Sequence, residues 1–221
     1  MDSFVVIVAG GNGSRMGSDI PKQFLELDGK PILMHTLERL YSITPNSNFV
    51  LVLPKIQFEY WHTLCEKHQF KFNYNLVEGG ESRFQSVKNG LSKISANSLV
   101  AIHDGVRPFI NKSVFESCMK EAKNRGAAIP TLAITDSIRE LGNNGSKIRD
   151  RNLFVSVQTP QCFQSQIIIE SYQQEFKPSF TDDASVVENN GHEVSLVKGN
   201  KENIKITTPE DLKVALSFIN R

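Results

Sequence analysis

Short apolar runs alternate with amphipathic stretches along the chain. Residues 4–8, 49–53, 99–102 and 127–130 are apolar at consecutive positions, which predicts strands buried on both faces, although Pro130 weakens the last one. Apolar positions at helical spacing predict helices over 31–41, 57–68, 82–94 and 113–125. The alternation indicates an α/β fold with a mainly parallel sheet flanked by helices. Ligands of such sheets bind beyond the carboxyl ends of the strands, so the residues after each strand are the first candidates for function.

The alternation breaks after residue 136, where residues 138–151 form a polar stretch. Within it, Asn143-Asn144-Gly145 favours the turn of a β-hairpin. We therefore predict a β-arm that projects from the sheet at about 137–157; a surface loop is an equally good account of the same residues. The whole chain, residues 1–221, fits a single domain that carries this arm.

The C-terminal part of the chain predicts one more strand and one more helix. Residues 203–206 predict the short strand. Thr208 and Pro209, followed by two acids, favour a helix start, because threonine caps free N–H groups and proline and acids suit the first turn.

Composition narrows the class of partner. A net charge of +1 provides no field that would attract nucleic acid or a membrane surface. No apolar run approaches the roughly 20 residues of a membrane span, and the apolar run 4–9 is too short for the apolar region of a signal peptide. Cys65, Cys118 and Cys162 lack the spacing of a zinc site or a disulfide framework. We expect a cytoplasmic protein that binds neither nucleic acid nor a membrane.

The first predicted strand runs directly into a glycine-rich segment, residues 9–17. Its four glycines let backbone N–H groups approach a ligand closely, which favours phosphate binding over a merely flexible turn. The segment is not a Walker loop, because Gly17 is followed by Ser18 instead of lysine. It is not a dinucleotide fingerprint either, because Met16 occupies the place of the third glycine.

Two cations accompany the glycine-rich segment. Arg15 lies within it, and Lys22 follows directly after Pro21. Cations held beside a phosphate stabilise the negative charge that spreads over its oxygens during attack at phosphorus. Solvated surface side chains are the alternative for both residues.

Residues 9–16 together with Pro21-Lys22-Gln23 resemble the signature of nucleotidyltransferases with a pyrophosphorylase-type, Rossmann-like fold. More narrowly, they resemble the 2-C-methyl-D-erythritol 4-phosphate cytidylyltransferase family. The resemblance covers nearly the whole chain, and its strength lies in the order and spacing of the motifs. The further motifs are Gly79-Gly80-Glu81-Ser82-Arg83 with Ser86-Val87, His103-Asp104-Gly105-Val106-Arg107-Pro108, Asp150-Arg151-Asn152, Gln158-Thr159-Pro160-Gln161, Thr181-Asp182-Asp183-Ala184-Ser185 and Asn203-Ile204-Lys205-Ile206-Thr207.

The resemblance implies a role for each motif on the nucleotide side of the site. Arg15 and Lys22 are implied to stabilise the charge at the α-phosphate of CTP. Asp104 is implied to bind Mg²⁺, the expected cofactor, although a turn aspartate is the alternative interpretation. The implied nucleotide contacts are Ala9, Gly10, Gly11, Asn12, Gly13, Gly80, Glu81 and Ser86.

On the acceptor side, Lys205 and Arg151 are implied to position the phosphate of a sugar-alcohol phosphate. In the family this arginine comes from the arm of a partner subunit, so the resemblance implies a homodimer with composite active sites. His103 is expected to be a hydrogen-bonded structural histidine, and Asp182 either binds acceptor hydroxyls or starts a helix. The implied acceptor contacts are Asp104, Arg107, Ser137, Arg151, Thr159, Thr181 and Lys205. Ser137 and Gly105 depart from the family pattern, where threonine and alanine are common.

The implied reaction is an in-line displacement in which the acceptor phosphate attacks the α-phosphorus of CTP and pyrophosphate leaves. No covalent enzyme intermediate is needed, because a phosphate monoester is already ionised at neutral pH. Ribitol-5-phosphate cytidylyltransferase remains the nearest alternative, since its acceptor differs by a few hydroxyls and one methyl group. Alternatives of other classes are a non-catalytic nucleotide-binding regulatory protein, which the retained cations disfavour, and an NAD-dependent dehydrogenase, which the failed fingerprint disfavours.

Overall fold

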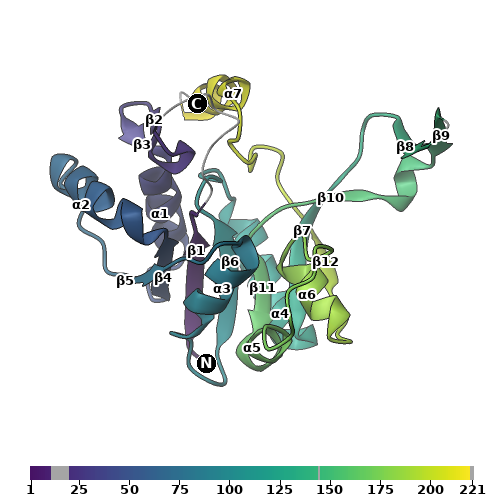
Figure 1. Ribbon diagram of the computed structural model, residues 1–221, viewed down its shortest axis with the longest axis horizontal. Helices are drawn as coiled ribbons and strands as arrows, with labels where there is room; N and C mark the ends of the chain where they lie inside the picture. The colour runs from purple at the N-terminus through teal and green to yellow at the C-terminus, as the bar shows by residue number, and fades with distance from the viewer. Residues whose placement is uncertain (11–19, 144, 220–221) are drawn as a thin grey trace.

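A central sheet of eight strands forms the body of the protein (Figure 1). The computed structural model describes residues 1–10, 20–143 and 145–219. Along the sheet the strands follow the order β10-β7-β11-β6-β1-β4-β5, and β12 pairs with β7. Their bounds are β1 Ser3–Val8, β4 Asn48–Leu53, β5 Asn75–Glu78, β6 Leu99–Asp104, β7 Ala127–Ala133, β10 Val155–Val157, β11 Gln161–Gln164 and β12 Ser195–Lys198.

The four predicted buried strands are confirmed as β1, β4, β6 and β7. β1 lies between β4 and β6 and is parallel to both, and β5 is parallel to β4. Every residue of β6 is buried, as expected for a strand covered on both faces. The prediction of a mainly parallel sheet is therefore confirmed.

Four short strands of the sheet, β5, β10, β11 and β12, escaped the sequence prediction. β11 lies between β6 and β7 and is antiparallel to both, and β10 pairs antiparallel with the end of β7. Their residues carry no long apolar run, so their strand character depends on the neighbours they pair with.

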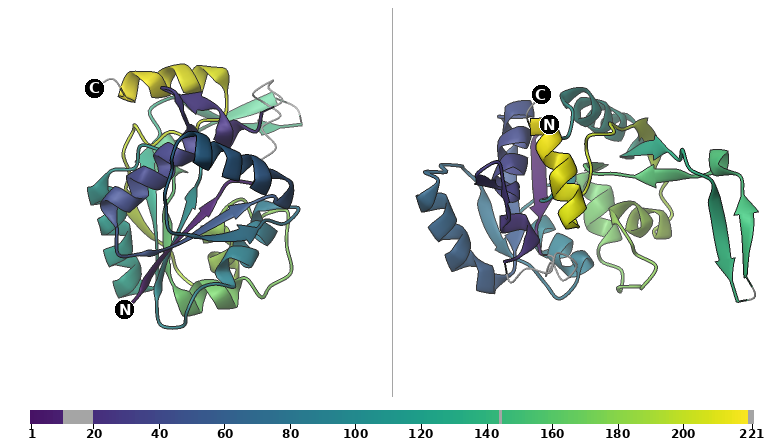
Figure 2. Two further views of the ribbon diagram at one scale, coloured as in Figure 1. Left: turned by 90° about the vertical axis from the view of Figure 1, so that its left-hand side faces the viewer. Right: turned by 90° about the horizontal axis from the view of Figure 1, so that it is seen from above.

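Helices cover both faces of the sheet (Figure 2). α1, α2 and α4 pack on one face, where Leu37, Trp61 and Phe115 join a cluster with Val5 and Leu51 of the strands. α3, α5 and α6 pack on the other face. The bounds of these helices are α1 Ile32–Ile43, α2 Phe58–Lys67, α3 Arg83–Leu91, α4 Lys112–Arg125, α5 Ser165–Ser171 and α6 Asp183–Asn189.

Local sequence explains where several helices begin and end. The Ser82 side chain caps α3 by accepting from the Gln85 N–H. Asp182 caps α6 in a reciprocal arrangement with Ser185. α4 ends at Gly126, whose φ of +97° favours a residue without a Cβ. Short 3-10 turns, η2 Lys22–Phe24, η3 Lys55–Gln57 and η4 Arg151–Leu153, and a small hairpin of β2 Glu26–Leu27 and β3 Lys30–Pro31 complete the connections.

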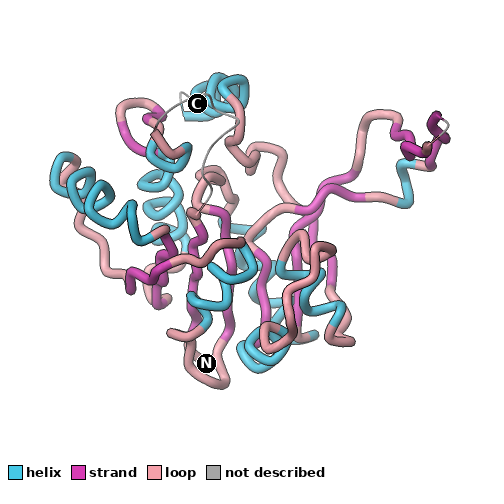
Figure 3. Tube along the Cα trace, in the orientation of Figure 1, coloured by secondary structure: helices cyan, strands magenta, loops and turns pink. Residues whose placement is uncertain are grey.

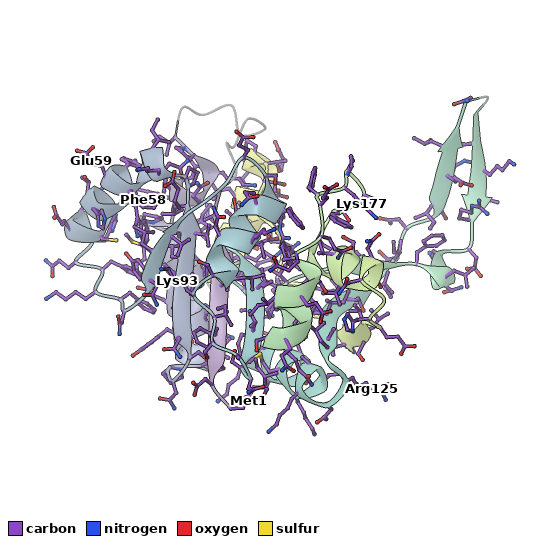
Figure 4. The ribbon with its side chains drawn as sticks, turned by 60° about the horizontal axis from the view of Figure 1, so that its bottom comes forward. Met1, Phe58, Glu59, Lys93, Arg125 and Lys177 are labelled. Carbon is purple, nitrogen blue, oxygen red and sulfur yellow. The ribbon has the colours of Figure 1, made fainter. Side chains whose placement is uncertain are left out.

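The predicted arm is a two-stranded hairpin that projects from the body, as Figures 2 and 4 show. β8 Ile138–Gly142 pairs antiparallel with β9 Gly145–Arg149. Asn144 of the predicted turn lies outside the described residues. The predicted arm ended at 157, whereas β10 at Val155–Val157 has already rejoined the central sheet. The chain thus leaves and re-enters the sheet at its β7 side.

The prediction of a strand over 203–206 is wrong. The segment between β12 and the last helix, α7 Pro209–Ile219, is loop throughout (Figure 3). It is held by isolated bonds instead of a ladder; the Ile206 N–H, for example, donates to the Val106 carbonyl at 3.0 Å. The predicted helix start is confirmed, since the Asp211 N–H donates to Thr208 Oγ1 at 3.2 Å.

Candidate active site

A pocket of about 460 Å³ lies beyond the carboxyl ends of β1, β4, β5 and β6. This is the edge at which a parallel sheet collects the residues that follow its strands. A larger hollow of about 650 Å³ lies elsewhere, beside α3 and α5, and contains none of the predicted site residues. Of the predicted contacts, the first pocket brings together Ala9, Gly10, Lys22, Gly80, Glu81, Ser86, Asp104 and Lys205.

Two glycine-bearing segments form one wall of the pocket. Ala9 and Gly10 continue β1, and Gly80 follows β5. Ser86 joins the two: the Gly80 N–H donates to its hydroxyl at 3.1 Å, and a Cβ on Gly10 would lie 3.6 Å from the same oxygen. A Cβ on Gly80 would lie 2.5 Å from that of Gln85, so the position requires glycine. This wall presents backbone to a ligand.

Cations gather around Asp104 at the end of β6. Asp104 Oδ2 accepts from Arg107 Nε at 3.0 Å and lies 3.1 Å from Lys205 Nζ. Arg83 Nε lies 3.8 Å from Oδ1. Burial alone would raise the pKa of Asp104, but Lys205, Arg83 and Arg107 outweigh it and hold the pKa well below its usual range. Asp104 is therefore an ionised carboxylate among three positive charges.

The residues behind Asp104 form a buried polar network. Thr159 Oγ1 accepts from the Asp104 N–H at 3.1 Å and lies 3.0 Å from His103 Nδ1, while His103 Nε2 lies 3.0 Å from the Arg107 carbonyl. The carbonyl can only accept, so His103 donates from Nε2 and accepts at Nδ1. Burial lowers the pKa of His103 to about 4, so the ring is neutral. The expected structural role of His103 is confirmed. Thr159 is only 5% exposed, and its hydroxyl is already engaged in this network.

Arg83 lines the pocket although the sequence interpretation assigned it no role. Its guanidinium donates two bonds to the buried Asp183 carboxylate, at 2.8 and 2.6 Å, and the Tyr172 hydroxyl donates to the same carboxylate at 2.6 Å. Bidentate pairs of this kind fix the plane of a guanidinium. Arg83 and Asp183 both belong to motifs of the resemblance, but nothing in the sequence indicated that they pair, because they lie 100 positions apart.

Side-chain amides hold the loop that carries Lys205. Gln158 Nε2 donates to the carbonyls of Asn200 and Asn203, at 3.0 and 3.1 Å. Asn203 Nδ2 donates to the Thr159 carbonyl at 2.7 Å. A loop without a strand ladder is thus positioned by buried amides, and it places Lys205 beside Asp104.

Five predicted acceptor contacts do not line this pocket: Arg107, Ser137, Arg151, Thr159 and Thr181. The Arg107 guanidinium donates to Asp104 and to the Asn203 carbonyl, and Thr159 is buried behind Asp104. Ser137 and Arg151 lie at the base of the arm and are exposed, and Arg151 donates to the Thr135 carbonyl. Thr181 is exposed next to the α6 cap, where Asp182 acts as the helix-start acid. The predicted contacts Gly11, Asn12, Gly13 and Arg15 lie outside the described residues.

The described part of the chain contains no group of three His, Cys, Asp or Glu side chains that could hold a metal ion by themselves. Asp104 and Glu81 are the acids of the pocket lining. Within the same described residues, no helix is long and apolar enough to span a membrane.

A backbone-lined wall, a ring of cations and an ionised carboxylate at the carboxyl edge of a mainly parallel sheet define an α/β protein of the nucleotidyltransferase class. The family model of 2-C-methyl-D-erythritol 4-phosphate cytidylyltransferase matches residues 3–221. The chain belongs to this family.

Relatives of the chain carry the same family name. It is 50% identical to 2-C-methyl-D-erythritol 4-phosphate cytidylyltransferase of Phocaeicola vulgatus, over 97% of this chain and 98% of that one. It is 48% identical to that of Bacteroides thetaiotaomicron, over 99% and 100%. The fold is similar to the crystal structure of 4-diphosphocytidyl-2C-methyl-D-erythritol synthase from Anaerococcus prevotii, with a TM-score of 0.83, 28% identity and coverage of 100% and 96%.

Proposed function

We propose that the chain transfers the cytidylyl group of CTP to 2-C-methyl-D-erythritol 4-phosphate, giving 4-diphosphocytidyl-2-C-methyl-D-erythritol and pyrophosphate in the non-mevalonate route to isoprenoids. Family membership over residues 3–221 supports the reaction. The observation that carries it in the structure is the convergence of Lys22, Arg83 and Lys205 on a pocket that glycine backbone also lines. That pocket has room for a nucleotide and charge for its phosphates.

The cations account for the chemistry of the transfer. The acceptor phosphate is ionised at neutral pH and attacks the α-phosphorus of CTP in line with the departing pyrophosphate. Lys22 stabilises the charge that develops on the α-phosphate oxygens, while Lys205 and Arg107 neutralise the incoming phosphate. Without them two polyanions would repel one another across the pocket.

Mg²⁺ is the cofactor that we propose for the transfer. Mg²⁺ is commonly held by one or two carboxylates together with substrate phosphates, and Asp104 is an ionised carboxylate at the pocket wall. Its Oδ1 lies farther from a cation than Oδ2 does, at 3.8 Å against 3.0 Å. The metal would supply charge neutralisation at the triphosphate.

The arm suggests a homodimer with composite sites. Leu141 is 86% exposed and Ile148 is 65% exposed on the hairpin, and Leu153 and Phe154 are exposed at its base. Apolar side chains gathered on a projecting hairpin favour coverage by a second copy. Ser137 and Arg151 then contribute to the partner's acceptor site instead of their own.

The three free cysteines and the soluble substrates support a cytoplasmic location. A ribitol phosphate acceptor and a regulatory role without catalysis are not favoured, because the relatives at 46–50% identity are named for the methylerythritol reaction.

The test is pyrophosphate release with Mg²⁺, offering CTP, UTP, ATP and GTP against 2-C-methyl-D-erythritol 4-phosphate and ribitol 5-phosphate. We expect release with CTP and the methylerythritol acceptor only. Release with CTP and ribitol phosphate alone would move the acceptor assignment to the related enzyme. Silence in every combination from folded protein would refute catalysis of this kind.

A further inference from the structure

Gln23 is a fully buried side chain that lines the nucleotide pocket next to Lys22. Its Nε2 donates to the Ala9 carbonyl at 2.7 Å and to Gln57 Oε1 at 2.8 Å. A backbone carbonyl can only accept, so Nε2 and not Oε1 must face Ala9. The orientation of the amide is therefore set by its partners.

The Ala9 carbonyl needs this donor because the ladder of β1 ends beside it. The Val8 carbonyl accepts from the Gly105 N–H at 3.0 Å, and the Ala9 N–H donates to the Val52 carbonyl at 3.0 Å. Ala9 is buried, and the chain leaves the sheet at Gly10. A buried carbonyl without a donor is costly, so the Gln23 amide stabilises the backbone at the start of the glycine-rich segment.

The turn η2, which carries Gln23, packs against α2. The neighbouring Phe24, 2% exposed, stacks on Trp61 of α2, with ring centroids 6.0 Å apart, and meets Tyr60 edge-on. The turn η2 is thus anchored by apolar packing at Phe24 and by the amide at Gln23. Lys22, the first residue of that turn, lines the pocket.

We propose that Gln23 is a positioning residue for the transfer: its amide ties the start of the glycine-rich segment to the turn that carries Lys22, so that the triphosphate site and its cation keep one relative placement. The proposal rests on the proposed function of this pocket. Gln23 acts through Ala9 and Lys22, on the nucleotide side, while Lys205 and Arg107 serve the acceptor side.

The test compares two isosteric variants with a matched control. Gln23→Glu and Gln23→Met keep the shape of the side chain and remove the donor to Ala9, one with a charge and one without. Gln57→Glu places the same charge next to the same amide but retains an acceptor for Gln23 Nε2. Steady-state kinetics with CTP and 2-C-methyl-D-erythritol 4-phosphate, together with thermal unfolding, would be measured for all four proteins.

Both Gln23 variants should lower kcat/KM for CTP by about tenfold or more, through a higher KM for CTP and a lower kcat, because one buried acceptor has lost its donor. The KM for the acceptor and the kinetics of Gln57→Glu should stay within about twofold of the wild type. A fall in kcat with both KM values unchanged would mean a merely smaller folded fraction and would overturn the proposal. Equal losses of kcat/KM in Gln57→Glu and Gln23→Glu, with normal kinetics in Gln23→Met, would also overturn the proposal, because the buried charge alone would then explain the loss. An inactive wild-type protein would instead refute the proposed function itself.

Discussion

At the scale of single residues, the site depends on cations whose neighbours define their task. Lys205 and Arg107 share one carboxylate oxygen of Asp104, whereas Lys22 lines the pocket from the turn η2. Gly105 illustrates how tightly this edge is built, since a Cβ there would lie 2.8 Å from that of Ala9 and 3.0 Å from Leu33 Cδ1. Glycine in place of the common alanine thus matches the close approach of β6 to β1.

Replacing Lys22 with alanine should lower kcat on the order of a hundredfold while the protein stays folded, because a cation at the α-phosphate acts mainly in the transition state. Lys55→Ala is the matched control, since Lys55 is 76% exposed in the next turn and does not line the pocket. Pyrophosphate release and circular dichroism would be measured for both. Near-normal turnover of Lys22→Ala would remove this lysine from the mechanism.

At the scale of elements, periodicity predicted the buried strands and the helices well, because β1, β4, β6 and the long helices carry their pattern within themselves. Elements that depend on distant partners were missed. β11 and β10 are strands because β6 and β7 offer them ladders, and 203–206 is a loop because side-chain amides replace a ladder there. The hairpin turn was predictable, since its signal lies in adjacent residues.

The arm is the element whose role in a shared site can be tested by mixing variants. Arg151→Ala and Lys22→Ala proteins should each be nearly inactive, and mixing them under conditions of subunit exchange should restore about a quarter of the wild-type activity if the arm completes the partner's site. In a mixed dimer, one of the two composite sites then holds both the native Lys22 and the native Arg151. Exchange shown by mass spectrometry without any regained activity would place Arg151 in its own subunit's site or in none.

At the scale of the whole molecule, buried polar groups link the stability of the fold to pH. His103 is neutral in the folded protein, with its pKa lowered from 6.5 to about 4 by burial, whereas the unfolded chain takes up a proton below about 6.5. Asp104 acts in a lower range, because a carboxylate with a depressed pKa loses its contribution only below its ordinary value of 3.8.

The free energy of unfolding should therefore fall as the pH drops from 6.5 towards 4, by roughly 3 kcal/mol from His103 alone, at about 1.4 kcal/mol for each pH unit. His103→Gln removes the titrating ring and keeps a donor and an acceptor. Urea unfolding between pH 7.5 and 4.5 would compare the two proteins. An identical pH slope in the variant would show that other groups govern this range.

The sequence by itself determined the α/β alternation, the glycine-rich segment after the first strand and the arm, because each depends on residues that are close together in the chain. It also determined the family, which the order and spacing of the motifs identify. The tertiary structure alone decided which side chains meet. Arg83 is fixed by Asp183 across 100 positions, Gln23 supports Ala9, and Gln158 holds the loop of Lys205. The physical reason is that hydrophobic periodicity is a local property, whereas the pairing of buried polar groups depends on the order in which the sheet brings distant strands together.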